Sequence, residues 1–436
     1  MLYLGHKNGK ILWAGGLEYS SDTSEVIAVP KDLETINKHV LVTEYIVWRN
    51  KIIRQSELWD MPIEELRVAV ISLYSINCGI ATYTKYLCDA MRPLVKELKI
   101  FAEDAEPEFC INDAQDNVVR CWDRRDDYMR IFPEIESYNP DLIIVQHEYG
   151  SFSRGASWNA LLGNLSRWRT LVMLHSVYDH PDKLIFEAPC QEIITHSLGG
   201  KKLLKAKGID HCPIHYVPHG CLSELGRINT KFSNVGSDHL LFQYGFGFEY
   251  KGWDNAILIV DKLKEKYPDV MYVGIFNTSK YAKKFHDHYY DLLIEKIRQR
   301  NLQKHFTLLK GFRSEEVLLS YLSQSKVGLF PYWNHHEWRV YGGSGAVRLA
   351  MASGIPLVLG DVPFFEEFRG YIPICQHVDE YVDTISRIFE DKPYEESIKQ
   401  NIAKFISERT WDKVARWYLE CKPDKEFVAP VGNHEN

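Results

Sequence analysis

Residues 67–83 read RVAVISLYSINCGIATY, and this stretch decides how the whole chain is interpreted. An apolar run at residues 68–73 leads through a short polar loop into a helical pattern that begins beside Gly79. A short apolar strand followed by a covering helix is the unit of a parallel sheet with helices on both faces. The unit recurs, because further apolar runs alternate with helical stretches at residues 98–101, 142–145, 171–174, 193–195, 214–217, 240–244, 270–276, 306–309, 327–330, 356–359 and 372–375.

The recurring units fall into two series, separated by a polar stretch near residues 227–237. We therefore expect an α/β fold with two parallel-sheet domains. Asn8-Gly9 between short apolar runs predicts a β-hairpin, and the segment around it is expected to be a small β-rich appendage. The predicted divisions are 1–62 for the appendage, 63–228 and 229–408 for the two domains, and 409–436 for a closing helix and tail.

Composition narrows the class of partner and the cellular location. The formal net charge of −7 disfavours a nucleic-acid partner, while a small anionic ligand needs only a few local donors. No apolar run approaches the ~20 residues that span a bilayer, and the first residues carry charges where a secretory signal has its apolar core. The nine cysteines form no C-x-x-C pair, which is typical of reduced thiols. These features predict a cytoplasmic protein.

The lysines of residues 201–207 predict a solvated helix face, with peripheral contact to an anionic membrane as the alternative.

Polar residues follow the predicted strands of the first domain, at the edge where open parallel sheets bind ligands. Gly79 follows the first strand, and a glycine beside a helix N-terminus lets an anion approach backbone N–H groups. A simple tight turn explains this glycine equally well. A glutamate and several histidines follow other strands: His147, Glu148, His175, His196 and His219. Their spacing fits no zinc pattern, so we expect a polar cleft wall without a metal.

Two glycine-rich loops mark the second domain. Gly245 follows its first strand, and Lys251 stands just before a predicted helix. A cation beside a glycine-rich turn and a helix N-terminus predicts a diphosphate clamp, with a solvated lysine as the alternative. Gly343, Ser344 and Gly345 open a second helix, which Ser344 is expected to cap while backbone N–H groups point at a phosphate. Capping alone would also explain that sequence.

Six short segments, taken together and in their order along the chain, form a recognisable pattern. They are residues 78–81 (CGIA), 141–148 (DLIIVQHE), 217–220 (VPHG), 245–252 (GFGFEYKG), 350–356 (AMASGIP) and 411–415 (WDKVA). From about residue 67 to 419 this order resembles the retaining glycosyltransferases of family four. The resemblance implies the glycosyltransferase-B fold, in which two Rossmann-like domains face each other across a cleft. It also implies transfer of a sugar from a nucleotide diphosphate sugar to an acceptor hydroxyl, with retention of anomeric configuration and no metal or other cofactor.

The resemblance further implies roles for the parts of this chain. The domain at 229–408 would hold the nucleotide-sugar donor, and the domain at 63–228 would hold a glycan, a lipid-linked compound or another hydroxyl acceptor. Lys251 would contact the donor diphosphate, Gly79 would approach the donor phosphate, and His175 would lie beside the transferred sugar. Closure of the domains would align donor and acceptor and exclude water. The oligomeric state is left open.

The chain departs from the family pattern at the donor site. The family places two glutamates eight positions apart, where this chain has Tyr341 and Leu349. Glu337 is expected to substitute for the first of them. The family's G-R motif reads G-F here, and Arg348 or Arg339 is expected to supply the missing phosphate cation.

These departures keep two other functions open. One is a catalytically silent protein that binds a sugar or nucleotide, and the other is a nucleotide-sugar epimerase of the same fold. A nicotinamide-dependent oxidoreductase ranks last, because the G-x-G-x-x-G fingerprint is absent from the first loop.

Overall fold

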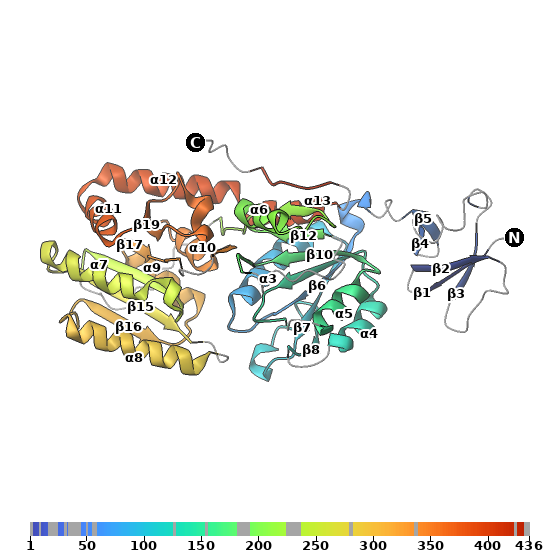
Figure 1. Ribbon diagram of the computed structural model, residues 1–436, viewed down its shortest axis with the longest axis horizontal. Coiled ribbons are helices and arrows are strands. Elements are labelled where there is room, and N and C mark those ends of the chain that lie inside the picture. The colour runs from blue at the N-terminus through green and yellow to red at the C-terminus, as the bar shows by residue number, and fades with distance from the viewer. Residues whose placement is uncertain are drawn as a thin grey trace.

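The structure is a computed structural model of the chain. It describes residues 3–7, 10–15, 25–29, 33, 45–48, 51–54, 59–124, 128–152, 156–180, 192–223, 237–278, 282–334, 339–422 and 425–430. Figure 1 shows two α/β lobes side by side and a small sheet near the N-terminus.

The N-terminal sheet is antiparallel, with the strand order β3-β1-β2-β4-β5. The β-rich appendage expected from the sequence is therefore present. Residues 8–9, on which the hairpin prediction rested, lie outside the described residues, but the strands that flank them pair with each other. The strands are β1 (Tyr3–Lys7), β2 (Lys10–Gly15), β3 (Glu25–Ala28), β4 (Tyr45–Trp48) and β5 (Lys51–Arg54).

The first lobe is built on a parallel sheet of seven strands in the order β13-β12-β10-β9-β6-β7-β8. Its strands are β6 (Arg67–Ser72), β7 (Glu97–Glu103), β8 (Val118–Trp122), β9 (Leu142–His147), β10 (Arg169–Leu174), β12 (Glu192–Thr195) and β13 (Ile214–Tyr216). Its helices are α3 (Gly79–Met91), α4 (Ile131–Tyr138), α5 (Ala156–Leu165) and α6 (Leu198–Ala206).

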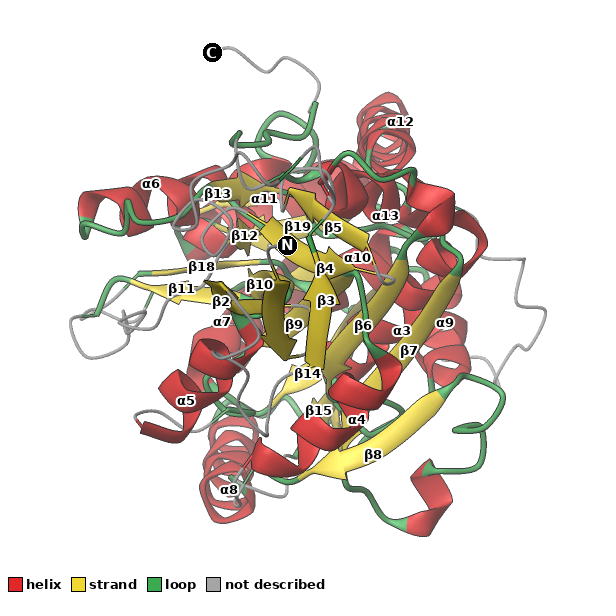
Figure 2. Cartoon of the chain, turned by 90° about the vertical axis from the view of Figure 1, so that its right-hand side faces the viewer, coloured by secondary structure: helices red, strands yellow, loops and turns green. Residues whose placement is uncertain are grey.

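The continuous apolar runs are explained by burial on both faces of this sheet. Ala69 and Ile71 of β6 pack with residues of α4 and α5, whereas Val68 and Val70 of the same strand pack with α3. Side chains alternate between the two faces of a strand, so a strand covered on both sides must be apolar throughout. Figure 2 shows α4 and α5 on one side of the sheet and α3 on the other.

The second lobe has a parallel sheet of six strands in the order β16-β15-β14-β17-β19-β20. Its strands are β14 (Leu240–Phe246), β15 (Met271–Asn277), β16 (Phe306–Lys310), β17 (Val327–Phe330), β19 (Leu357–Gly360) and β20 (Ile374–Cys375). Its helices are α7 (Trp253–Lys266), α8 (Lys283–Gln299), α9 (Glu315–Gln324), α10 (Gly345–Met351), α11 (Val378–Glu390) and α12 (Lys392–Glu408). The two-lobed α/β architecture expected from the sequence is confirmed.

Two features join the lobes. The last helix, α13 (Trp411–Glu420), leaves the second lobe after α12 and packs against α3 of the first, where Trp411, Val414 and Tyr418 enter the core. A separate two-stranded antiparallel sheet pairs β11 (Ser176–Tyr178) with β18 (Val340–Gly342). Because β11 follows β10 of the first sheet and β18 precedes α10 of the second lobe, this small sheet holds a loop of each lobe against the other.

Candidate functional site

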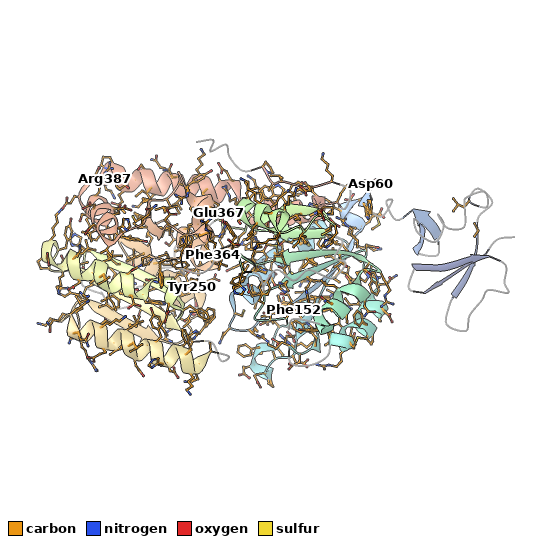
Figure 3. All side chains as sticks on the ribbon, in the orientation of Figure 1. Asp60, Phe152, Tyr250, Phe364, Glu367 and Arg387 are labelled. Carbon is orange, nitrogen blue, oxygen red and sulfur yellow. The ribbon has the colours of Figure 1, made fainter. Side chains whose placement is uncertain are left out.

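A cleft of about 600 Å³ lies between the lobes, at the carboxyl ends of their strands. Its walls come from the loop after β6 and the start of α3 on one side, and from the ends of β14 and β15 and the start of α10 on the other. Tyr250 and Phe364, labelled in Figure 3, lie on the part of the second lobe that faces the first. The cleft is therefore where an open parallel sheet is expected to bind its ligand.

The cleft brings together most of the residues singled out in the sequence. Those that line it are Gly79, Glu148, His175, His219, Gly245, Lys251, Gly343, Ser344, Gly345 and Arg348. His147 is not among the lining residues, and Glu337 lies outside the described residues.

Lys251 is positioned by the tight entry into α7. Gly252 after it has a φ of 73°, and a Cβ there would lie 1.8 Å from the carbonyl oxygen of Pro331, so only glycine fits. The Lys251 Nζ donates to the Tyr332 hydroxyl at 2.8 Å and lies 4.9 Å from the Tyr250 ring centroid. Burial by itself lowers the pKa of Lys251, but the hydroxyls of Tyr250 and Tyr332 raise it, and the net shift is upward. The Lys251 ammonium group in the cleft therefore lies over the Tyr250 and Tyr332 rings.

The second glycine-rich loop has the predicted cap. The Ser344 Oγ accepts a hydrogen bond from Val347 N at 3.4 Å, and Gly345 and Ala346 of the first turn of α10 line the cleft. Gly343 packs closely on His219, since a Cβ there would lie 3.0 Å from that side chain. The loop is therefore held against the first lobe with its backbone at the cleft surface.

Arg348 is bound differently from the expectation of a free phosphate cation. Its guanidinium is 2% exposed and pairs with the Glu367 carboxylate, and its Nε donates to the backbone oxygen of His219 at 3.1 Å. Most of its charge is balanced inside the protein. Arg339, the other candidate, is exposed and is not among the residues that line the cleft. Sequence reasoning could not identify Glu367 as the partner, because Glu367 lies in η8 (Pro363–Phe368) and only the tertiary structure brings its carboxylate to Arg348 of α10.

His175 is the first residue after β10 and is almost fully buried at the cleft wall. Its Nε2 lies 2.8 Å from Gln146 Oε1, and its Nδ1 lies 3.4 Å from His196 Nε2. Burial, with a smaller effect from His147, lowers the pKa of His175 to about 3. The imidazole is therefore neutral at pH 7.

The other strand-end histidines occupy different environments. His219 lines the cleft, and its Nδ1 donates to the Gly220 oxygen at 2.7 Å. Burial lowers the pKa of His219 and of His196 well below the ordinary value. His147, expected in the cleft wall, instead stacks on Phe152 and packs against the Tyr149 and Trp158 rings, and burial lowers its pKa to about 3.

Glu148 and the strand after His175 form one corner of the cleft. The Glu148 carboxylate accepts from the Ser176 hydroxyl at 2.7 Å and from Tyr149 N at 3.0 Å. On the opposite side, Tyr341 packs on Gly199 at the start of α6 rather than entering the cleft. Leu349 does line the cleft. The family that the sequence resembles has glutamates at these two positions. In this chain, Tyr341 packs between the lobes and Leu349 is an apolar residue of the cleft wall.

Sequence reasoning missed several polar groups of the cleft, among them Arg313, Asn277 and the pair Tyr86–Glu315. Arg313 follows β16, and Asn277 ends β15, so the strand-end rule could have found both. Tyr86 of α3 donates to the Glu315 carboxylate at the start of α9. No local sequence pattern could predict the contact between Tyr86 and Glu315, because the two residues belong to different lobes.

Three features of the described residues concern metal and membrane binding. Among them, no group of three or more His, Cys, Asp or Glu side chains is arranged to hold a metal ion. No helix in the described part of the chain has the length and apolar character needed to cross a membrane. Lys201 and Lys205 both contact Glu426, at 2.8 Å each, so the charge of this helix face is partly balanced within the protein.

Comparison with solved structures identifies the fold. A crystal structure of HepE from Anabaena in complex with UDP and glucose matches with a TM-score of 0.60 and 13% identity over 82% of this chain and 99% of that chain. Sucrose-phosphate synthase from Thermosynechococcus elongatus matches with a TM-score of 0.62 and 15% identity over 81% and 97%. Trehalose-6-phosphate synthase from E. coli, bound with UDP-2-fluoro glucose, matches with a TM-score of 0.60 and 13% identity over 82% and 99%.

No family model matches the chain, and no curated protein matches it either. At these identities the likeness establishes the fold. The protein has the glycosyltransferase-B fold, in which two Rossmann-like domains face each other across the cleft described above.

Proposed function

We propose that this protein is a glycosyltransferase that moves a sugar from a nucleotide diphosphate sugar to an acceptor hydroxyl with retention of anomeric configuration. The observation that carries the proposal is the meeting of Lys251, the Gly343–Gly345 loop and His175 in one cleft between two Rossmann-like lobes. Solved structures similar to this chain contain bound UDP, UDP-glucose or UDP-2-fluoro glucose, which supports a UDP-sugar as the donor.

The geometry suggests how the cleft would promote transfer. Negative charge builds on the leaving diphosphate as the glycosidic bond breaks. Lys251, Arg313 and the backbone N–H groups of Gly345 and Ala346 would stabilise this charge in a site partly shielded from water. The Arg348 charge is balanced by Glu367, so Arg348 would support the reaction only indirectly, by holding the Gly343–Gly345 loop through its contact with the Ser344 oxygen. No side chain is assigned as a nucleophile.

The proposal includes the acceptor side and the conditions of the reaction. The loop after β6 and the start of α3 would receive the acceptor hydroxyl, which belongs to a glycan, a lipid-linked compound or another alcohol. We further propose that the reaction needs no metal and takes place in the cytoplasm. The contacts of Lys201 and Lys205 with Glu426 favour a solvated helix face there over a membrane-binding one.

Turnover tests the proposal directly. The purified chain is incubated with UDP-glucose and other nucleotide sugars together with a panel of alcohol acceptors, and nucleoside diphosphate release is followed. We expect release that depends on the acceptor, with the product's anomeric proton coupling showing retention. Nucleotide binding without turnover would point to a silent binding protein. Nucleotide release without any acceptor would point to the epimerase.

A further inference from the structure

A line of buried polar side chains runs along the cleft wall and passes through His175. The Tyr83 hydroxyl of α3 lies 2.9 Å from the Tyr418 hydroxyl of α13. The Tyr418 hydroxyl also interacts with the side chain of Gln146, at the end of β9. His175 Nε2 lies 2.8 Å from the Gln146 amide, and His196 Nε2 lies 3.4 Å from His175 Nδ1. The line therefore joins side chains of α3, α13 and β9 with the histidines that directly follow β10 and β12.

The protons along this line cannot be assigned with the Gln146 oxygen facing His175. An amide oxygen only accepts, so His175 Nε2 would carry the proton and Nδ1 would accept from His196 Nε2. The neutral His196 ring would then have no proton on Nδ1, which lies 3.2 Å from the Val217 carbonyl oxygen. Two acceptors would face each other. In addition, Gln146 Nε2 would be buried beside the Tyr418 hydroxyl without a well-formed hydrogen bond to it or to another described residue.

An imidazolium at His196 would remove the conflict, but burial lowers the pKa of His196 well below its ordinary value. Two other arrangements remain. In the first, His175 is an imidazolium that donates from both nitrogens. In the second, the Gln146 amide is turned by 180°, so that its nitrogen donates to His175 Nε2 and its oxygen accepts from the Tyr418 hydroxyl. His175 Nδ1 then donates to His196 Nε2, and His196 Nδ1 donates to the Val217 oxygen. Amide oxygen and nitrogen have nearly the same shape, so hydrogen bonding decides between them.

Burial decides between the two arrangements. The His175 ring is almost fully buried, and its pKa falls to about 3 because the charged form loses its hydration. No carboxylate makes a hydrogen bond to this ring among the described residues, so nothing offsets that cost. The turned amide also gives Gln146 Nε2 a well-formed hydrogen bond, to His175 Nε2, which it does not have in the other orientation.

We propose that Gln146 and Tyr418 are positioning residues that fix His175 as the neutral Nδ1–H tautomer and hold its ring at the cleft wall. This inference rests on the proposed function, in which His175 lies beside the transferred sugar. Both ring nitrogens are then engaged inside the protein. His175 acts by shape and fixed orientation and exchanges no proton with the substrate. The helix α13, which crosses from the second lobe, thereby sets the geometry of a donor-site residue in the first.

Nitrogen NMR of the whole chain tests the tautomer without any need for turnover. The protein is labelled with ¹⁵N-histidine, and the His175 ring signals are assigned by their loss in His175→Asn. At pH 7 we expect a protonated Nδ1 and an unprotonated Nε2. A protonated Nε2, alone or together with Nδ1, would overturn the proposal. This result stands whether or not a glycosyl transfer is found, so it is separable from failure of the proposed function.

Two variants test the positioning role. Gln146→Glu keeps the shape but replaces the donor by an acceptor, so His175 Nε2 should become protonated and kcat should fall by about tenfold or more. The dissociation constant for UDP should stay within about twofold, because Lys251 lies in the other lobe. Tyr418→Phe removes only the hydroxyl that donates to Gln146, so the His175 signals should show both tautomers and kcat should fall several-fold.

The control is Tyr138→Phe, which removes a buried hydroxyl of the same lobe that donates to the Val68 oxygen at 3.2 Å. It should leave the His175 signals and kcat unchanged. If Gln146→Glu fails to fold, Tyr418→Phe carries the test by itself, since its ring packing is retained. Folded Gln146→Glu or Tyr418→Phe protein with wild-type His175 signals and wild-type kcat would overturn the assignment.

Discussion

Replacing Lys251 by methionine should weaken the binding of a nucleoside diphosphate while leaving the fold intact. The methionine keeps most of the length of the lysine stem on the Tyr250 and Tyr332 rings, whose centroids lie 4.9 and 4.1 Å from Nζ. A hydrogen bond between charged groups contributes about 1.5–3 kcal/mol when one partner is removed. At about 1.4 kcal/mol per factor of ten, the dissociation constant for UDP should rise by about tenfold to a hundredfold.

The variant should also lose some folding stability while keeping the fold. It loses one hydrogen bond to the Tyr332 hydroxyl and two cation–π contacts, with the Tyr250 and Tyr332 rings, together about 1.5–3.5 kcal/mol. Calorimetric titration with UDP, GDP and ADP, paired with urea denaturation, separates the two effects.

The matched control is Lys266→Met at the opposite end of α7, where the ammonium lies 5.3 Å from the Tyr267 ring centroid and pairs with Glu390. Lys266 is not among the residues that line the cleft, so nucleotide affinity should stay at the parent value. Parent-like UDP affinity in Lys251→Met would refute the diphosphate clamp and remove the best residue of the proposed donor site.

Three further outcomes follow from the same geometry. Arg348→Met should lower the free energy of unfolding by about 3–5 kcal/mol. It removes the main partner of the buried Glu367 carboxylate, whose other cation, the Arg409 guanidinium, lies 3.9 Å away. Urea denaturation measures this, and the additional change Glu367→Gln should restore part of it. Gly252→Ala should lower the free energy of unfolding by at least about 1–3 kcal/mol, because alanine is strained at a φ of 73° and its Cβ would clash with the Pro331 oxygen. Thermal denaturation measures this loss. A midpoint equal to that of the parent protein would contradict the account of how the chain enters α7. Sugar transfer should continue in EDTA, and loss of turnover that manganese restores would show that a metal is needed.

The repeated strand–helix pattern was sufficient to predict the architecture. Every apolar run singled out in the two series lies on a strand of the parallel sheets, with ends displaced by a few residues. Within the described parts of the two lobes, three strands were missed. β8 is an edge strand whose side chains are only partly buried at its start, and β11 and β18 are three residues each. Strands this short acquire their identity from pairing with each other across the two lobes, which leaves no periodic signal in either segment.

The sequence by itself determined where ligand-binding groups could stand, because parallel strands bring their carboxyl ends, and the loops after them, to one edge of each sheet. It placed Lys251, Ser344 and His175 at that edge, and all three line the cleft. Only the tertiary structure decided what each polar group is free to do. Arg348 lies at the same edge, yet Glu367 neutralises it. His175 is engaged through Gln146, which itself contacts the last helix. Local periodicity follows from backbone geometry, whereas the partner of a buried charge or ring nitrogen is set by packing between segments far apart in the chain.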